Sequence, residues 1–346
     1  MTKELGSASR EELLRAARAG DDDAFHRLVG PHLAELRAHC YRMLGSFQDA
    51  EDALQDALLG AWRGLSGFEG RSSVRSWLYR IVTNACLKAI ERRPRRVLPV
   101  DFGPAADPHD DPGKPIVESV WVEPYPAGQL GLEDGLAGPE ARFEQRESVE
   151  LAFVAALQHL PARQRAVLIM REVLGFSGGE VAAALDTTPA SVYSALQRAH
   201  TALDERLPEQ SQQATLRSLG DERVRRLAED YVDAWERSDV DALVAMLTED
   251  AAMAMPPRPT WYRGREAIAA FLRLWPLADE LRSRLIPVDA NGQLAFGHYT
   301  WDGETSSYTA HGVDVLTLRG SEIDTMTTFL TPEALGQLGL PADIPA

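Results

Sequence analysis

A short segment of the chain concentrates positive charge and aromatic rings. Between Arg71 and Arg96 there are eight cations against one acid, Glu91, and Trp77 and Tyr79 lie among them. Cations that follow a phosphate backbone and rings on which bases stack are the side chains that bind single-stranded or melted DNA. In the alternative interpretation, both rings belong to the core and the arginines form a solvated face.

A second set of side chains could act as an acid and a base. Alternation along two adjacent strands of the C-terminal third places His298 on one face and Asp314 on a face of the next strand. An imidazole and a carboxylate that face one pocket can transfer protons, and Trp261 is a further candidate for lining that pocket. In the alternative interpretation, His298 is a core histidine whose ring nitrogens are hydrogen-bonded, and Asp314 is a hydrogen-bonded aspartate without a role in chemistry. We expect no metal site and no cofactor.

The pattern of a helix-turn-helix is present at residues 177–203. Two helices are expected, separated by Asp186-Thr187-Thr188, and Ser177 with Glu180 three residues later forms a capping-box pattern. The second helix buries an apolar stripe and presents polar side chains that suit a major groove. The candidates on that face are Ser191, Tyr193, Ser194, Gln197 and Arg198. A plain helical hairpin inside an enzyme is the alternative.

Long helices must position the basic segment. From Asp49 to Leu65 apolar residues recur at helical spacing, which predicts an amphipathic helix. A loop and a second helix from about Val74 to Arg92 follow, and Pro94 ends the helical run. The polar face of the first helix carries Asp49, Glu51, Asp52, Gln55 and Asp56.

Residues 97–140 differ in composition from the segments on either side. Eight prolines, with interspersed glycines and acids, predict a linker with little core of its own. Apolar islands at 116–117 and 120–122 and at Tyr125 indicate that this linker packs on another part of the protein.

From about residue 221 the hydrophobic period changes. Helices are expected near 224–235, 240–247 and 265–275. The rest predicts an antiparallel meander with hairpin turns, because turn dipeptides interrupt it at Asn291-Gly292, Asp302-Gly303 and Arg319-Gly320.

Composition narrows the class of protein. The 346 residues, 45% hydrophobic and 25% charged, predict two or three globular domains. The net charge of −16 argues against nucleic-acid binding. The cations are concentrated in one segment, however, and an acidic segment follows it, so the distribution of charge is more informative than the total. Cys40 and Cys86 predict reduced core side chains. With no signal peptide and no apolar run that spans a bilayer, we expect a cytoplasmic protein without a membrane partner.

Two stretches of the chain together carry a family resemblance. DAEDALQDALLGAWRGLSGFEGRSSVRSWLYRIVTNACLKAIERR and LPARQRAVLIMREVLGFSGGEVAAALDTTPASVYSALQRAHTAL resemble regions 2 and 4 of extracytoplasmic-function sigma factors, the promoter-recognising subunits of bacterial RNA polymerase. They occur in the family's order, with a linker between them, and cover about the first 207 residues.

The resemblance implies roles for the residues already singled out. It implies that the acidic face of Asp49 to Asp56 docks on core RNA polymerase, and that Phe68 to Ser73 form the loop that captures a flipped base of the −10 element. The −10 candidates are Phe68, Arg71, Ser72, Ser73, Arg75, Trp77, Arg80, Thr83 and Asn84. The helix from Pro189 would read the −35 element. Tyr193 and Ala195 stand where many members carry cations, which implies weaker phosphate anchoring.

The C-terminal part resembles a SnoaL-like cone fold. The motif Tyr262-Arg263-Gly264-Arg265-Glu266-Ala267-Ile268 between helices and a curved sheet carries this resemblance. Such cones enclose a pocket, and some are isomerases or cyclases. Asp302-Gly303-Glu304 departs from the Asp-Gly-Gly-Gly signature of one group of such sigma factors, so that role is not carried over.

The predicted fold is multidomain, with two all-α sigma domains and an α+β SnoaL-like domain. Region 2 is expected at 10–95, an acidic Pro-rich linker at 96–140, region 4 at 141–208 and the cone at 221–332. We expect a non-enzymatic sigma factor whose partners are core RNA polymerase and promoter DNA. Its C-terminal domain would modulate activity in cis, with a small apolar ligand as a candidate signal. The alternative is a small-molecule enzyme or ligand sensor with a DNA-targeting N-terminal part.

Overall fold

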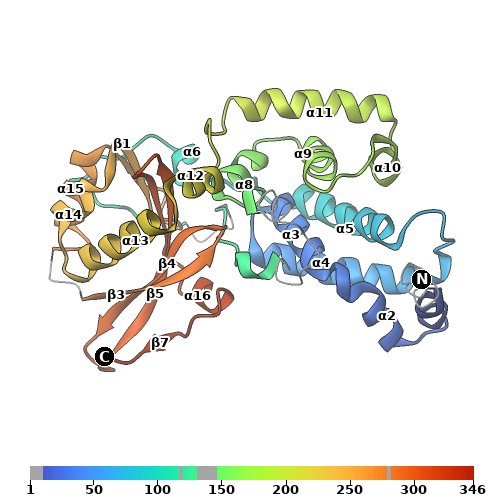
Figure 1. The fold of residues 1–346 in the computed structure, drawn as a ribbon, viewed down its shortest axis with the longest axis horizontal. Helices are drawn as coiled ribbons and strands as arrows, with labels where there is room; N and C mark the ends of the chain where they lie inside the picture. The colour runs from blue at the N-terminus through green and yellow to red at the C-terminus, as the bar shows by residue number, and fades with distance from the viewer. Residues whose placement is uncertain (1–10, 117–119, 131–145, 279–281) are drawn as a thin grey trace. The chain divides into compact units, whose positions relative to one another are not determined.

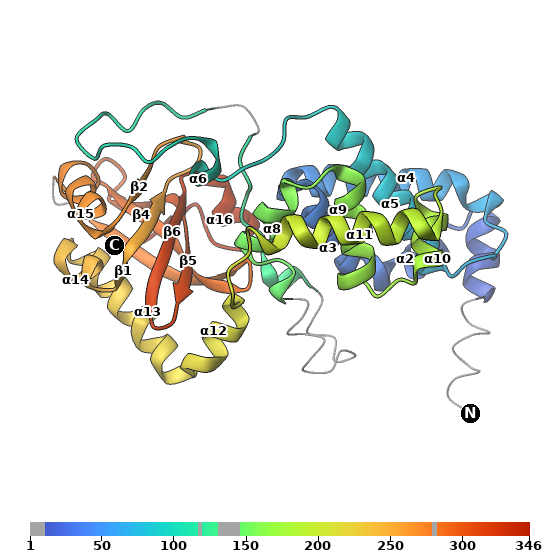
Figure 2. The same cartoon turned by 90° about the horizontal axis from the view of Figure 1, so that it is seen from above.

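The computed structural model describes residues 11–116, 120–130, 146–278 and 282–346, which form two compact units (Figures 1 and 2). The first unit comprises Met1–Arg93, Gln129–Glu133 and Leu157–Arg206. The second comprises Pro94–Gly128, Asp134–Ala156 and Leu207–Ala346. The chain therefore passes between the units more than once, and both contain segments that are far apart in sequence.

A helical bundle opens the first unit. It consists of α2 (Asp22–Val29), α3 (Leu33–Leu44), α4 (Phe47–Gly64) and α5 (Val74–Glu91). Gly45, at φ 69°, ends α3 in the left-handed conformation that favours glycine, and Ser46 then caps α4 by accepting from the amide of Asp49. The two long helices predicted from the apolar spacing are confirmed. Apolar side chains of α3, α4 and α5 form a shared core, among them Leu36, Tyr41, Met43, Ala50, Leu54, Leu78 and Val82.

Both cysteines belong to this core. Cys40 on α3 and Cys86 on α5 are fully buried and free, which confirms the prediction that they are core side chains. Burial raises the pKa of Cys40, and the neighbouring Cys86 raises it further. A protonated, inaccessible thiol is a poor nucleophile, so these residues act as small apolar groups.

The remaining helices of the first unit are α9 (Ala162–Leu168), α10 (Gly178–Ala184) and α11 (Pro189–Asp204). A π-helical turn, Ile169–Val173, follows α9. The predicted capping box is present, because Ser177 accepts from the amide of Glu180 and the Glu180 carboxylate accepts from the amide of Ser177 at 2.9 Å. Thr188 caps α11, and Pro189 occupies its first turn, where no backbone donor is needed.

A seven-stranded sheet forms the second unit, in the order β2-β1-β6-β5-β4-β3, with β7 paired to β5. Its strands are β1 (Leu247–Ala254), β2 (Trp261–Arg263), β3 (Ser283–Ala290), β4 (Gln293–Asp302), β5 (Ser307–Arg319), β6 (Glu322–Phe329) and β7 (Asp343–Ile344). Among the pairs of these strands, only β1–β6 is parallel in the part of the chain that the structure describes. The predicted turn Asn291-Gly292 joins β3 to β4, with φ of 56° and 64°, as a two-residue hairpin requires.

Helices α12 (Gln212–Leu219), α13 (Asp221–Glu236), α14 (Val240–Ala245), α15 (Arg265–Leu274) and α16 (Glu333–Gln337) accompany the sheet (Figure 1). Among them, α13, α14 and α15 bury one continuous core against the strands, and Leu216 and Leu219 of α12 pack on it. Its largest members include Tyr231, Trp235, Met253, Tyr262, Phe271, Phe296, Leu316 and Met326.

The backbone of the Pro-rich linker is hydrogen-bonded to other residues of the second unit. Trp261 Nε1 donates to the carbonyl of Gly103 at 2.8 Å, and the amide of Ala106 donates to the carbonyl of Trp261 at 2.8 Å. Further along, the amide of Ile116 donates to the carbonyl of Pro257 at 2.8 Å. The described linker residues are thus a strap over the domain, and a short helix, α6 (Pro99–Phe102), lies within it.

Candidate functional site

The acidic face of α4 borders a groove shared with α5. Asp49, Asp52 and Asp56 line a cavity of about 460 Å³ together with Lys88, Arg92 and Arg93. Arg93 forms an ion pair with Asp49, which is nearly buried, and lies 4.0 Å from Asp52. The groove therefore carries both signs of charge. It can bind a partner that supplies charges of both signs, which the sequence pattern of acids alone did not indicate.

The other two candidates on α4 do not line this groove. Glu51 is paired with Arg37 of α3 through a short hydrogen bond, and Gln55 is exposed. The predicted acidic face thus divides into a groove-lining set and two residues outside it.

Five of the −10 candidates lie on the surface. Arg71, Ser72, Ser73, Arg80 and Asn84 are exposed on α5 and on the loop before it. Phe68 is 6% exposed, and its ring lies 4.9 Å from the half-buried ring of Trp77. These two rings stabilise the loop by packing on each other, as the core interpretation of Trp77 anticipated.

Thr83 does not lie on that surface. It is fully buried, and its Oγ1 lies 2.9 Å from Nε2 of His39 on α3. Burial lowers the pKa of His39 to about 3, with Arg42 and Arg75 adding to the effect, so the imidazole is neutral at pH 7. Thr83 lies on the face of α5 that Val82 and Cys86 also occupy, and this face packs on the core of the bundle.

Arg75 is engaged within the first unit. Its Nε donates to Glu35 Oε2 at 3.2 Å, its Nη2 donates to the carbonyl of Leu174 at 3.4 Å, and its guanidinium lies 4.7 Å from the ring of Phe176. Burial acts to raise the pKa of Glu35, but His32 and Arg75 together outweigh it and hold that pKa below its ordinary value. This arrangement places a −10 candidate against the segment before α10.

A second contact lies one residue further along α5. Ser76 Oγ donates to Glu180 Oε1 at 3.3 Å, and the Phe176 ring meets the Tyr79 ring edge-on at 5.2 Å. These pairs are about 100 residues apart in sequence. No local pattern signals them, and sequence reasoning missed them.

Helix α11 presents the predicted polar face. Ser191, Tyr193, Ser194, Gln197 and Arg198 are all exposed, whereas Val192, Ala195, Ala199 and Leu203 are buried. The predicted amphipathic pattern is therefore present, with the apolar stripe holding the helix and the five polar candidates on its exposed face. Tyr193 is 58% exposed, an unusual exposure for a large ring.

His298 and Asp314 meet inside the sheet unit. His298 Nδ1 lies 3.4 Å from Asp314 Oδ2, and Tyr231 Oη donates to the same oxygen at 3.1 Å. Nε2 of His298 is 3.0 Å from the Ser283 hydroxyl. Burial acts to raise the pKa of Asp314, but the neighbouring His298, Thr328 and Tyr231 together hold it below its ordinary value. Strand alternation predicted His298 and Asp314 as groups of one pocket; the structure brings them together with Tyr231, and all three side chains are almost completely buried.

Trp261 stands apart from this group. Its indole donates to the linker carbonyl of Gly103, so it anchors the strap and is not paired with His298 or Asp314. Within the described ranges there is no group of three side chains that could hold a metal ion. No described helix is long and apolar enough to cross a membrane.

Comparisons with known proteins match three family models. Residues 28–96 match Sigma-70 region 2, residues 150–203 match Sigma-70 region 4, and residues 228–326 match a SnoaL-like domain. The chain is 40% identical over 329 residues to the ECF RNA polymerase sigma factor SigG of Mycobacterium tuberculosis, covering 94% of this chain and 85% of that protein. It is 34% identical over 195 residues to SigM of the same species, covering 56% and 83%.

A solved structure shares the fold along most of the chain. The crystal structure of the Mycobacterium tuberculosis extracytoplasmic function sigma factor SigJ is matched with a TM-score of 0.53 and 20% identity. The match covers 89% of this chain and 97% of that one. The fold, helical domains followed by an α+β sheet domain, is thus also found in that structure.

Proposed function

Because the chain belongs to the extracytoplasmic-function (ECF) sigma factors of RNA polymerase, we propose that its exposed face on α11 reads the −35 element of a promoter. Directing promoter-specific transcription initiation is the function of this family and of this chain. The carrying observation is that five polar side chains of α11, from Ser191 to Arg198, are exposed while a buried apolar stripe fixes their orientation. Bidentate contacts from Gln and Arg to base edges supply specificity.

The test is run-off transcription with core polymerase on the chain's own promoters. The double variant Gln197→Ala, Arg198→Ala should abolish most promoter-dependent transcript, because two base-reading side chains are lost, each contributing about 1–3 kcal/mol of discrimination. The control Thr305→Ala, at an exposed loop position of the sheet unit, should leave it intact. Equal activity of the two variants would exclude α11 as the reading helix.

We propose that α5 and its preceding loop follow the −10 strand. Arg71 and Arg80 support this proposal because they are exposed cations on α5 and on the loop before it, and the exposed Asn84 lies one turn beyond Arg80, where it also lines the α4–α5 groove. Phe68 and Trp77 support the loop, while Thr83 stabilises the bundle through His39 and takes no part in reading. Arg75 becomes available only when its contacts with Leu174 and Phe176 open.

Core RNA polymerase is proposed to dock on the α4–α5 groove. Asp49, Asp52 and Asp56 offer carboxylates, and Arg93 competes for two of them within the free protein. A partner must replace these internal ion pairs with ion pairs of its own. The exchange therefore contributes more to the specificity of docking than to its affinity. Since polymerase and promoter DNA reside in the cytoplasm, the proposed location is cytoplasmic.

We propose that the SnoaL-like domain modulates transcription in cis and catalyses no reaction. The linker strap supports the first part, because the chain between regions 2 and 4 is hydrogen-bonded to this domain at several points, such as Thr260 Oγ1 to the carbonyl of Pro112 at 2.6 Å. The group of His298, Asp314 and Tyr231 supports the second, because all three side chains are almost completely buried away from solvent.

Loosening the strap tests this proposal. Arg258 donates to the carbonyl of Gly113, so the double variant Arg258→Ala, Thr260→Val removes two anchors. It should change transcript yield without changing affinity for core polymerase. An unchanged yield would exclude the strap as the means of control. Turnover of a small molecule that is lost in Asp314→Asn, with promoter binding intact, would instead favour the enzyme alternative.

A further inference from the structure

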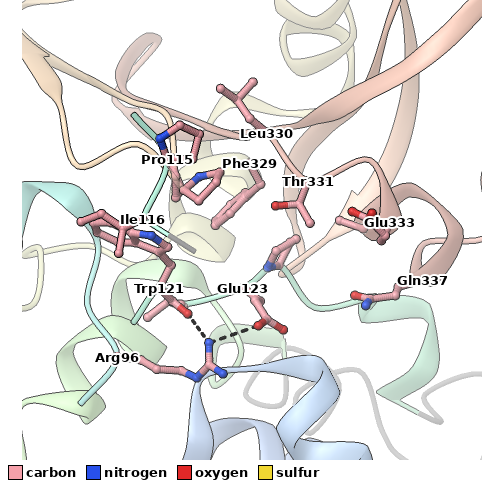
Figure 3. Close-up of a pocket in the computed structure, with 15 residues that line it drawn as sticks. Arg96, Pro115, Ile116, Trp121, Glu123, Phe329, Leu330, Thr331, Glu333 and Gln337 are labelled. Carbon is pink, nitrogen blue, oxygen red and sulfur yellow. Dashed lines mark hydrogen bonds and ion pairs between the residues drawn. The ribbon is translucent and has the colours of Figure 1, made fainter. Parts of the chain in front are cut away.

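A cavity of about 360 Å³ lies in the sheet unit, where the linker crosses the end of β6 and the start of α16 (Figure 3). It is separate from the buried group around His298 and Asp314, none of whose members line it. Linker residues form one wall, and the domain forms the other through the Pro256-Pro257 turn, the Phe329–Thr331 segment and α16. Its volume falls within the range of small-molecule sites, about 300–1,000 Å³.

The walls of this cavity are mainly apolar. The apolar lining residues are Pro115, Ile116, Trp121, Val122, Pro124, Pro256, Pro257, Phe329, Leu330 and Ala334. The linker wall is held in shape, because Val97 pairs with Trp121 in an isolated bridge and the amide of Val122 donates to the carbonyl of Val97 at 3.1 Å. An apolar body that fills the cavity is therefore stabilised by removal of its surface from water.

Charge at the cavity is unbalanced. Arg96 is 5% exposed and donates to the carbonyl of Trp121 at 2.6 Å and to Glu123 at 3.1 Å. These two opposite charges cancel. Glu333 remains at the rim, exposed and without an ion pair to any described residue (Figure 3). The lining thus carries one net negative charge, which repels carboxylate and phosphate ligands and attracts a cation.

We propose that this cavity binds a small apolar amine, with its hydrocarbon body between the linker and the domain and its ammonium group beside Glu333. The rings of Trp121 and Phe329 line the same space, and aromatic faces attract cations. Because the two walls come from different segments, an occupant holds the linker on the domain and adds RT ln(1 + [L]/Kd) to the stability of that arrangement. Ligand binding at this cavity is a property beyond the proposed role in transcription, and it can be measured without a transcription assay.

Three probes that share one aromatic ring system but differ in charge separate the contribution of charge to binding from that of apolar burial. Naphthalen-2-ylmethylamine, naphthalen-2-ylmethanol and 2-naphthoate are cationic, neutral and anionic at pH 7. Titrated into the full-length protein and followed by calorimetry, the amine should bind tightest, the alcohol more weakly and the carboxylate least. Preference for the carboxylate, or no saturable binding by the amine, would overturn the proposal.

Variants of the protein locate the site. Glu333→Gln should weaken amine binding about two- to fivefold, as expected for loss of a partly solvated ion pair, and leave alcohol binding unchanged. Ala334→Phe should abolish binding of both by filling the cavity. The matched control Glu304→Gln, at an exposed loop position in the same unit, should bind like the natural chain.

The outcomes are read after thermal unfolding has shown that each variant is folded. Should Ala334→Phe fail to fold, Leu330→Trp fills the cavity from its neighbouring segment. Binding that survives both filling variants, or that is lost in Trp235→Phe inside the cone core, would overturn the proposed location.

Discussion

Asn291 and Tyr125 exchange two hydrogen bonds. The amide of Tyr125 donates to Asn291 Oδ1 at 3.0 Å, and the amide of Asn291 donates to the carbonyl of Tyr125 at 2.8 Å. Asn291 Nδ2 also donates to the carbonyl of Val149 at 2.8 Å. One buried side chain at the β3–β4 turn thus joins the end of the linker and the segment that leads into α8 (Leu151–Gln158). Asparagine suits this place because it also tolerates a φ of 56°.

Asn291→Ala should lower the free energy of unfolding by about 2–4 kcal/mol, because a buried amide and a buried carbonyl lose their partner and alanine is strained at positive φ. Chemical denaturation measures it. Ser306→Ala is the matched control, since Ser306 has a φ of 53° but is exposed, and should cost only the strain. Similar losses for the two variants would show that strain alone explains the effect.

Glu150 caps α12 from a buried position. Its carboxylate accepts from the amides of Gln212 at 3.0 Å and Gln213 at 2.7 Å, and Glu147 accepts from the Ser211 hydroxyl beside it. Burial raises the pKa of Glu150 to about 7, partly opposed by the two amides and reinforced by the charge of Glu147. The folded protein therefore binds this proton more tightly than the unfolded chain does.

The stabilisation from Glu150 protonation should be complete below pH 4.5 and be lost as pH rises through 7, amounting to about 3 kcal/mol in all. Glu150→Gln, which cannot ionise, should remove this dependence and be more stable than the natural chain above pH 8. The free energy of unfolding of both proteins, measured from pH 5 to 8.5, checks the difference. Parallel curves, or the same change in the exposed control Glu304→Gln, would contradict the assignment.

Arg80→Ala should weaken binding of the holoenzyme to promoter DNA about equally for all −10 sequences and reduce the salt slope of log Kd by about 1, because a phosphate-binding cation is removed. Asn84→Ala should instead change the preference among −10 sequences, since an amide reads base edges. Arg63→Ala removes an exposed cation of α4 outside the proposed surface and serves as the control. A salt slope unchanged by Arg80→Ala would remove that residue from the proposed DNA path.

Tyr193→Arg should strengthen −35 binding and steepen its salt dependence by about one unit of slope, because a cation is added to an exposed position on α11. Thr201→Arg adds the same charge on the exposed side of α11 about two turns further along, more distant from the N-terminal residues that contact base edges. Fluorescence anisotropy with labelled promoter DNA at several salt concentrations distinguishes them. If Thr201→Arg has the larger effect, the orientation of α11 on the DNA is not the one proposed.

Local patterns in the sequence specified much of the fold and part of the candidate site. Apolar spacing placed α4, α5 and α11, the Ser177–Glu180 box marked the start of α10, and Asn291-Gly292 marked a hairpin. Each of these signals lies within a few residues, where backbone geometry and side-chain capping act directly. The exposed face of α11 follows from the same period, because an amphipathic helix has one face to bury.

Tertiary structure alone decided which patterned residues are available. Thr83 lies on the buried face of α5 with Val82 and Cys86, but only the fold shows that its hydroxyl is paired with His39 on α3. Arg75 is held by Glu35, Leu174 and Phe176, the last two of which lie 99 and 101 residues away along the chain. The linker forms a strap whose apolar islands cover a cavity. The physical reason is common to all three: burial and pairing depend on chain segments that meet only after folding, and no local period encodes which segments meet.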